Sequence, residues 1–378
     1  MVKRILIDAT NVNISIPGGG SYCTKAYIEA LLALFPSQID VLHPEQAHIR
    51  DVRYHTIDVP VRNRLQRILG VTKGQFHRGA PFLVNYIEKY PDRYHTVFIS
   101  TGLYAGSMIS KIQKMGIRVI VLHHNFEPEF RMDSKNILTL KGKTDTLVRY
   151  WERRGYREAD INLFLTEQDR ILFEKSYGSH PHNYVSGVFE PTMEHQELSL
   201  PTNNHSAVIT CALGEIQNQA PLLRFAEHYL PVFEKTLPDW KIRLMGRTPS
   251  DTILDIAEKH DTILLIPNPE DIRALAAESA IYLCPMDAGG GLKLRIMDGL
   301  RAGQPILTHV RSARGYDALF QQPWFCIYED TDSFRQGLEH IVRYINSKDY
   351  SRSQIQAQYY ALFGLTAGIE RLKAILCP

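Results

Sequence analysis

Three consecutive glycines, Gly289 to Gly291, lie within the stretch PMDAGGGLKLRIMDGLRAGQPIL, between an apolar run and a segment with helical spacing. Glycines at the start of a helix let backbone N–H groups approach an anion closely, and the helix dipole favours negative charge there. The GxxxxGK[ST] pattern of a Walker A loop is absent. The glycine triplet therefore predicts a cradle for a diphosphate, and a tight strand-to-helix turn is the alternative.

Asp298 lies on the helix that we expect to begin near Leu292. It is eight residues beyond Gly290, a little over two helical turns, so it would lie on nearly the same face as the triplet. Its neighbours are apolar, and a buried carboxylate without a partner is costly. The hydroxyl pair of a ribose would be one partner. An internal ion pair with Arg295 or Arg301 is the alternative.

Apolar runs of strand length alternate with helix-like stretches along the whole chain. The expected strands are KRILIDA, IDVLH, HTVFIS, RVIVLHH and INLFLT, then AVITCAL, KIRLMG, TILLIP, AIYLCPM and QPILTH. Such alternation is typical of parallel sheets covered by helices on both faces. A polar, proline-containing segment interrupts the pattern near its middle. We therefore predict an α/β protein with two Rossmann-like doubly wound domains, 1–188 and 189–350, and a C-terminal helix, 351–378, that crosses back.

Composition excludes several classes of protein. The N-terminus has too few consecutive apolar residues for a secretory signal, and no apolar run approaches the ~20 residues that span a bilayer. The five cysteines are scattered singly, and the histidines lack the spacing of a zinc site. These observations favour a cytoplasmic enzyme without a structural metal.

Charge is divided unevenly between the two halves. Residues 1–188 hold 25 Lys and Arg against 18 Asp and Glu, whereas 189–378 hold 18 against 23. Two stretches of the first half combine cations with large apolar side chains, as proteins do on anionic lipid surfaces. We expect either reversible attachment to an anionic membrane or capture of a lipid-linked acceptor; a solvated helix face is the alternative. The cations singled out are Arg62, Arg64, Arg67, Lys141 and Lys143. No nucleic-acid recognition motif is present.

The glycine-containing stretch resembles the signature of retaining GT-B glycosyltransferases of the group-1 (family 4) class, in which two acidic residues flank a helix start. ALGEIQNQAPLLRFAEHYLPVFEKTL resembles the opening of that family's donor domain, and HHNFEPEF resembles its histidine-bearing loop. The resemblance implies two domains that face a cleft, a nucleotide-sugar donor and no obligatory metal. Gly290 stands where the family has its first acid, and Asp298 matches the second.

The same resemblance assigns roles to further residues. His124, at the end of RVIVLHH, would face the donor sugar, with a structural histidine as the alternative. Gly19 and Gly20 could bring backbone amides to the diphosphate, unless they form only a turn. The family's basic pair after the first donor-domain strand is missing, so Arg247 or Lys293 would neutralise the diphosphate instead.

These inferences favour a glycosyltransferase of hexosyltransferase type. It would move a sugar from a nucleotide diphosphate donor to a glycan, lipid-linked or small-molecule acceptor, as in polysaccharide biosynthesis, and the resemblance implies retention of configuration. A nucleotide-sugar epimerase of the same architecture and a catalytically silent nucleotide-sugar-binding protein are the alternatives.

Overall fold

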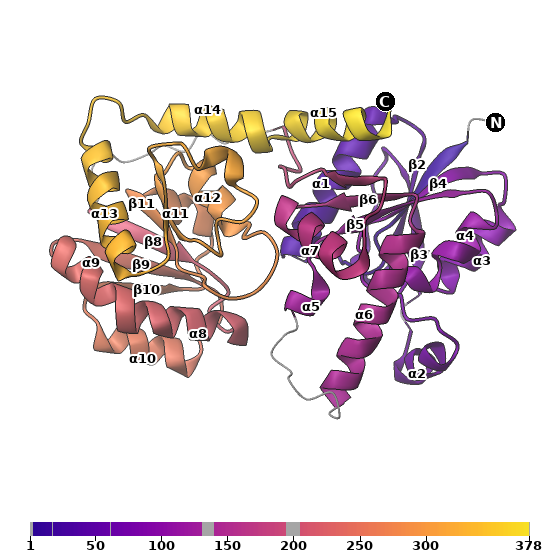
Figure 1. Ribbon diagram of the computed structural model, residues 1–378, viewed down its shortest axis with the longest axis horizontal. Coiled ribbons are helices and arrows are strands. Elements are labelled where there is room, and N and C mark those ends of the chain that lie inside the picture. Colours follow the sequence, from indigo (N-terminus) through magenta and orange to yellow (C-terminus); the bar gives the residue numbers. More distant parts are fainter. Residues whose placement is uncertain (1–2, 17, 61, 131–139, 194–204, 378) are drawn as a thin grey trace. The chain divides into compact units, whose positions relative to one another are not determined.

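The computed structural model describes the chain apart from residues 1–2, 17, 61, 131–139, 194–204 and 378 (Figure 1). The chain divides into two compact units, one formed by Met1–Met193 with Phe363–Pro378 and the other by Glu194–Leu362. Part of the connecting segment thus lies outside the described residues.

The first unit contains a seven-stranded, wholly parallel sheet in the order β3-β2-β1-β4-β5-β6-β7. The strands are β1 (Arg4–Asp8), β2 (Ile39–Pro44), β3 (His55–Val59), β4 (Tyr94–Ile99), β5 (Arg118–His123), β6 (Ile161–Phe164) and β7 (Asn183–Val185). The sequence order reverses between β1 and β4, so loops at the carboxyl ends of these strands border a switch point, where doubly wound sheets bind ligands.

The helices of the first unit enclose a hydrophobic core around this sheet. They are α1 (Gly19–Leu34), α2 (Arg64–Thr72), α3 (Phe82–Lys89), α4 (Ile109–Gln113), α5 (Glu127–Phe130), α6 (Leu140–Glu158) and α7 (Glu167–Tyr177), joined by the C-terminal helix α15 (Leu365–Leu376). Helix α15 packs against α1. The Nε of Arg371 donates a hydrogen bond of 2.9 Å to the carbonyl oxygen of Ser186. The last helix therefore belongs to the N-terminal unit.

The second unit contains a six-stranded parallel sheet in the order β10-β9-β8-β11-β12-β13. Its strands are β8 (Ser206–Thr210), β9 (Lys241–Gly246), β10 (Ile263–Pro267), β11 (Ile281–Cys284), β12 (Ile306–His309) and β13 (Phe325–Tyr328). Its helices are α8 (Ile216–Arg224), α9 (Leu230–Thr236), α10 (Asp251–Lys259), α11 (Ile272–Ala277), α12 (Arg295–Arg301), α13 (Thr331–Ile345) and α14 (Arg352–Phe363), and one π-helical segment, Phe225–Tyr229, links α8 to α9. Here the order reverses between β8 and β11.

The prediction of two doubly wound parallel sheets is confirmed, and all ten expected strands are present. The sequence reading missed β3, β7 and β13, each of which lies at the edge of its sheet. An edge strand is covered less completely than a central one, so its apolar pattern is weaker. The helix after the glycine triplet was placed wrongly, because α12 begins at Arg295 and not near Leu292.

Candidate functional site

The glycine triplet forms the loop between β11 and α12 in the second unit. Gly289 and Gly291 have φ values of +82° and +69°, in the left-handed region that side-chain-bearing residues rarely adopt. The Nζ of Lys293 lies 3.4 Å from the carbonyl oxygen of Gly290 and 3.1 Å from the point where a Cβ on Gly289 would be. The loop thus needs glycine for its conformation, and it brings the Lys293 ammonium against its own backbone.

Arg295 is the first residue of α12, and the sequence reading did not consider it as a ligand. Its Nη1 is buried and has no hydrogen-bond partner among the described residues. Burial raises the pKa of Cys211 and of Tyr282, and the positive charge of Arg295 opposes both shifts, so Arg295 lies near the residue that follows β8 and near β11. Arg295 is half-buried, and because a buried polar atom without a partner is costly, its Nη1 suits an anionic ligand. The sequence feature that could have indicated this ligand role is a cation four residues beyond Gly291.

Asp298 pairs internally. Its Oδ1 accepts a hydrogen bond of 2.7 Å from Nη1 of Arg301, and Nε of Arg273 lies 3.5 Å away. The Asp298 side chain is 30% exposed, whereas Arg301 is buried. The expectation of two helical turns between the triplet and Asp298 is wrong, because α12 begins only three residues before Asp298. The ion pair with Arg301, which the sequence left as the alternative, is present.

Arg247 follows β9 directly and is exposed. Its carbonyl oxygen accepts a hydrogen bond of 3.1 Å from the N–H of Leu213, which follows β8. Arg247 therefore lies at the same carboxyl edge as the triplet. Within the described part of the chain, no hydrogen bond or ion pair joins its side chain to Gly289–Gly291.

One further ion pair flanks the glycine loop. Nε and Nη2 of Arg224, the last residue of α8, donate to the two carboxylate oxygens of Asp287 in a bidentate pair. The π-helical segment begins at the next residue. Because Asp287 precedes the triplet by two residues, this pair fixes the loop to α8. No sequence pattern indicated this contact, since the two residues are far apart in the chain.

In the first unit, Gly19 and Gly20 begin α1, and His124 follows β5. A Cβ added to Gly20 would lie 3.9 Å from Nδ1 of His124 and 3.6 Å from Val12. Gly20 therefore lies close to the imidazole of His124, at a distance where a Cβ would make only ordinary van der Waals contact. Burial lowers the pKa of His124 to about 4, so the ring is neutral near pH 7. Its Nε2 is buried and has no hydrogen-bond partner among the described residues.

The loop that follows His124 is held by two buried carboxyl groups. The N–H of Phe126 donates to Oδ1 of Asp169 at 3.1 Å, and the N–H of Glu127 donates to Oε1 of Glu152 at 3.0 Å. Tyr177 donates its hydroxyl proton to Oε2 of Glu152 at 2.7 Å. Burial raises the pKa of Glu152 to about 8. These contacts fix the backbone just beyond the histidine.

The neighbouring His123 has a structural role. It is buried, its Nε2 lies 2.9 Å from Oδ1 of Asn162, and its ring stacks on Phe164. Because burial lowers the pKa of His123 to about 4, the neutral ring donates to the amide oxygen. The two adjacent histidines therefore differ in their surroundings, since Nε2 of His123 contacts Asn162 whereas the buried Nε2 of His124 has no hydrogen-bond partner among the described residues.

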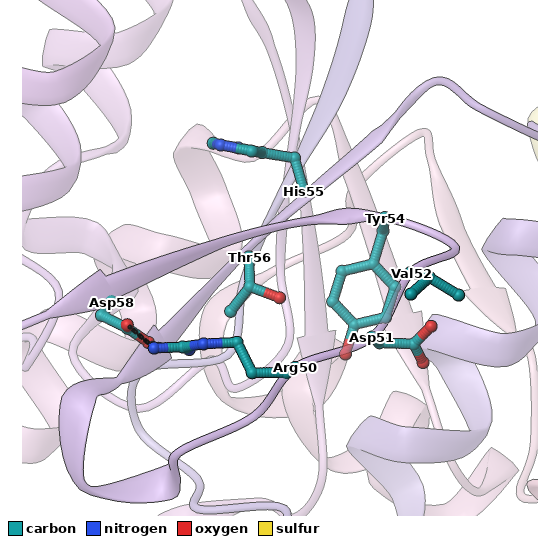
Figure 2. Close-up of a pocket in the computed structure, with 7 residues that line it drawn as sticks. All are labelled: Arg50, Asp51, Val52, Tyr54, His55, Thr56 and Asp58. Carbon is teal, nitrogen blue, oxygen red and sulfur yellow. Dashed lines mark hydrogen bonds and ion pairs between the residues drawn. The ribbon is translucent and has the colours of Figure 1, made fainter.

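A separate cavity of about 420 Å³ opens beside the edge strand β3 (Figure 2). Its lining residues are Arg50, Asp51, Val52, Tyr54, His55, Thr56 and Asp58. Arg50 pairs with Asp58 at 3.0 Å, and Asp51 pairs with Arg53 at 2.6 Å. Both carboxylates are thus compensated by arginines, and the cavity has no excess of positive charge that would select a diphosphate. None of the residues singled out from the sequence lines it.

The cations predicted to meet a membrane are only partly described. Arg62 is directed inward, because Nη2 donates to the carbonyl oxygen of His77 at 2.8 Å and Nη1 donates to that of Gln75 at 3.3 Å. Arg62 is half-buried, and its part in binding a lipid surface stays a prediction. The structure does not describe the side chains of the other four cations, Arg64, Arg67, Lys141 and Lys143. Among the described residues, no helix is long and apolar enough to cross a bilayer, and no cluster of three metal-ligating side chains occurs.

Solved structures with the same architecture match both units together. HepE of Anabaena in complex with UDP superposes with a TM-score of 0.65 at 12% identity over 100% of both chains. The chain has the GT-B fold. Sucrose-phosphate synthase of Thermosynechococcus elongatus matches this GT-B chain with a TM-score of 0.69 at 11% identity, over 99% of this chain and 98% of that one.

A third solved structure, a glycosyltransferase from Rickettsia africae, matches with a TM-score of 0.63 at 10% identity over 100% of this chain and 99% of that one. No protein-family model matches the sequence, and no curated protein matches it. The resemblance to retaining GT-B glycosyltransferases is thus confirmed in the fold, at sequence identities too low for alignment of single residues.

Proposed function

We propose that the protein is a glycosyltransferase that takes a sugar from a nucleotide diphosphate donor held by its second unit. The observation that carries this proposal is the buried Nη1 of Arg295, without a described partner, at the start of the helix that follows the glycine triplet. An anion at this place would neutralise the guanidinium and receive backbone N–H groups of Gly289 to Gly291. The structure of HepE with UDP-glucose, a full-length match to this chain, supports a donor of that class.

The leaving diphosphate would be stabilised by fixed charges and amides. As a glycosidic bond to the diphosphate breaks, negative charge grows on the leaving oxygen, and preorganised donors lower that barrier. Arg295 and Lys293 lie at the glycine loop, and Arg247 lies at the same edge of the sheet. None of these roles needs a metal ion. Asp298, partly exposed beyond its pair with Arg301, would accept hydrogen bonds from the ribose.

In the first unit, His124 would contact the donor sugar. Its neutral ring lies beside Gly20, and its buried Nε2 has no partner among the described residues. The loop that follows is held in place because the backbone N–H groups of Phe126 and Glu127 donate to buried carboxyl groups. Gly19 and Gly20 would add backbone amides. The acceptor would be a glycan, a lipid-linked sugar or a small molecule, and the resemblance implies retention of configuration.

One observation favours a second candidate. The Asp298 carboxylate already has an internal partner, and Gly290 stands where related signatures carry an acid. A protein that only binds nucleotide sugars would have this arrangement. An epimerase of the same fold would instead isomerise the donor without an acceptor.

The experiment that separates these functions incubates the protein with a panel of nucleotide sugars and measures released nucleoside diphosphate. Transfer, or slow hydrolysis in the absence of acceptor, releases it. An epimerase produces an isomeric nucleotide sugar and no free diphosphate. A silent binder shows only a ligand-dependent rise in melting temperature. Release that is abolished by Arg295→Met supports the proposal, whereas release by neither protein contradicts it.

A further inference from the structure

Helix α2 exposes three large apolar side chains. Leu65 is 71% exposed, Ile68 55% and Leu69 57%. They are spaced by three and four residues, so they lie on one face of the helix. Figure 1 shows α2 set apart from the sheet of its unit. Isolated exposed leucines are ordinary, but a contiguous apolar face on one helix marks an interaction surface.

Local contacts give α2 its helical form. The N–H of Gln66 donates to Oδ1 of Asn63 at 2.9 Å, and the N–H of Asn63 donates to Oε1 of Gln66 at 2.9 Å. This is the reciprocal arrangement of a capping box, which satisfies donors at a helix start. Arg62 anchors the preceding turn through the carbonyl oxygens of Gln75 and His77. The helix is therefore held at its ends, and the described side chains of Leu65, Ile68 and Leu69 are exposed along it.

The segment that contains α2 carries charges of one sign in its sequence. Residues 62–78 contain five Lys and Arg and no Asp or Glu, and the uninterrupted absence of acids extends from Val59 to Ile87. Lys73 and Arg78 are exposed. Cations that flank an apolar helix face are the pattern of helices that lie in the interface of an anionic bilayer.

Helix α6 continues the same surface. The ring of Phe76, just beyond α2, packs on Trp151 of α6 with ring centroids 5.1 Å apart, and Gly74 lies against the same indole. Tyr150 is 55% exposed, and its ring lies edge-on to Trp151 with centroids 4.9 Å apart. Arg149 and Arg153 are also exposed, but they lie beside Tyr177 of α7, on the other side of α6 from Trp151. Tyrosine at a membrane surface keeps its ring apolar and its hydroxyl wet. The docking face is therefore defined as Leu65, Ile68, Leu69, Lys73 and Tyr150.

We infer that this docking face binds the surface of an anionic lipid bilayer. The apolar side chains of α2 would enter the headgroup boundary while the cations meet lipid phosphates. Association with a second copy through the same face is disfavoured, because it would bring two sets of like charges together. The attachment is peripheral, and it is independent of the reaction proposed above.

The test is flotation of the full-length protein with vesicles, without nucleotide or sugar. Phosphatidylcholine vesicles with and without phosphatidylglycerol are compared at low and high salt. The wild-type protein should float with the phosphatidylglycerol vesicles at low salt, less at high salt, and not with pure phosphatidylcholine. Absence of binding to the anionic vesicles, or equal binding to both compositions, overturns the inference.

Two sets of variants locate the contact. Leu65→Ser, Ile68→Ser and Leu69→Ser together should weaken binding at least about tenfold, because each removes apolar area that the interface would bury. Lys73→Glu should weaken it and reduce its salt dependence, whereas Arg149→Glu, on the other side of α6, should not. The matched control is Leu254→Ser, an exposed leucine of α10 that is 45% exposed and should leave flotation unchanged.

The far-ultraviolet circular dichroism and melting temperature of each variant establish that it is folded. Wild-type binding by both sets of folded variants overturns the assignment to this face. Self-association of the wild-type protein in sedimentation, lost in the serine variant and unaffected by vesicles, would assign the face to a second copy and would also overturn it.

Discussion

The carboxylate of Asp298 and the guanidinium of Arg301 form a hydrogen-bonded ion pair of 2.7 Å, one turn apart on α12. Arg301 is buried, and Asp298 is the partly exposed member. The pair therefore gives Asp298 a structural task, to neutralise a buried cation, in addition to the ligand contact that we propose for it.

Asp298→Asn should weaken nucleoside diphosphate binding by roughly 10- to 150-fold if the carboxylate accepts hydrogen bonds from the ribose. Calorimetry with the ribose and 2′,3′-dideoxy forms of the ligand isolates this contact. Wild type should bind the dideoxy form poorly, and the variant should no longer distinguish the two forms. Unchanged discrimination by the variant would leave the Arg301 pair as the whole role of Asp298.

Arg295→Met should lower nucleoside diphosphate affinity by roughly tenfold or more, since a charge-assisted contact contributes about 1.5–3 kcal/mol. The variant should be at least as stable as wild type without ligand, because methionine removes a buried Nη1 that has no described partner and keeps apolar volume. Gly290→Val is a companion that blocks close approach of the diphosphate. Equal ligand affinity of Arg295→Met and wild type would exclude a phosphate contact.

His124→Ala should lower turnover much more than nucleoside diphosphate affinity, because a contact with the donor sugar is used mainly on the way to the transition state. Single-turnover kinetics and calorimetry on the same preparation separate the two effects. His123→Ala is the contrasting variant, since its ring is bonded to Asn162 and its loss should appear first as lower stability. Parallel loss of stability and activity in His124→Ala would mark it as structural.

Stability should fall as the solution is acidified from pH 6.5 towards pH 4. Burial lowers the pKa of His43 and of His123 to about 4, from the usual 6.5, so the unfolded chain binds more protons in this window. Each histidine contributes roughly 1–3 kcal/mol that is present above pH 6.5 and lost near pH 4. Urea unfolding across this range measures the slope. The slope should be shallower in His43→Gln, and an identical slope would argue against the lowered pKa.

For Glu152 we expect the opposite dependence of stability on pH, at higher pH values. Its pKa is raised to about 8, above the usual 4.5, so its contribution to stability is complete below pH 4.5 and is lost as pH rises towards 8. Glu152→Gln keeps an acceptor for the N–H of Glu127 and a partner for Tyr177. It should match wild type near pH 5 and exceed it by roughly 1–3 kcal/mol at pH 8. A constant difference between the two proteins across this range would refute the shift.

The sequence determined the parts of this protein that depend on local periodicity and on buried strands. The central strands, such as β1, β4 and β5, are nearly continuous apolar runs because both faces of a parallel sheet are covered, and this pattern is readable residue by residue. The glycine triplet was equally visible, because the φ values of +82° at Gly289 and +69° at Gly291 exclude most other residues.

Tertiary structure alone decided which groups meet. Asp298 could have paired with Arg295, with Arg301 or with a ligand, and only packing selected Arg301 and left the Nη1 of Arg295 buried without a described partner. Arg62 looked like a surface cation, yet its guanidinium turns inward because carbonyl oxygens from a later turn lie within reach. Composition shows how many charges a segment carries. Their burial and partners depend on chain segments distant in sequence, whose approach only the folded core fixes.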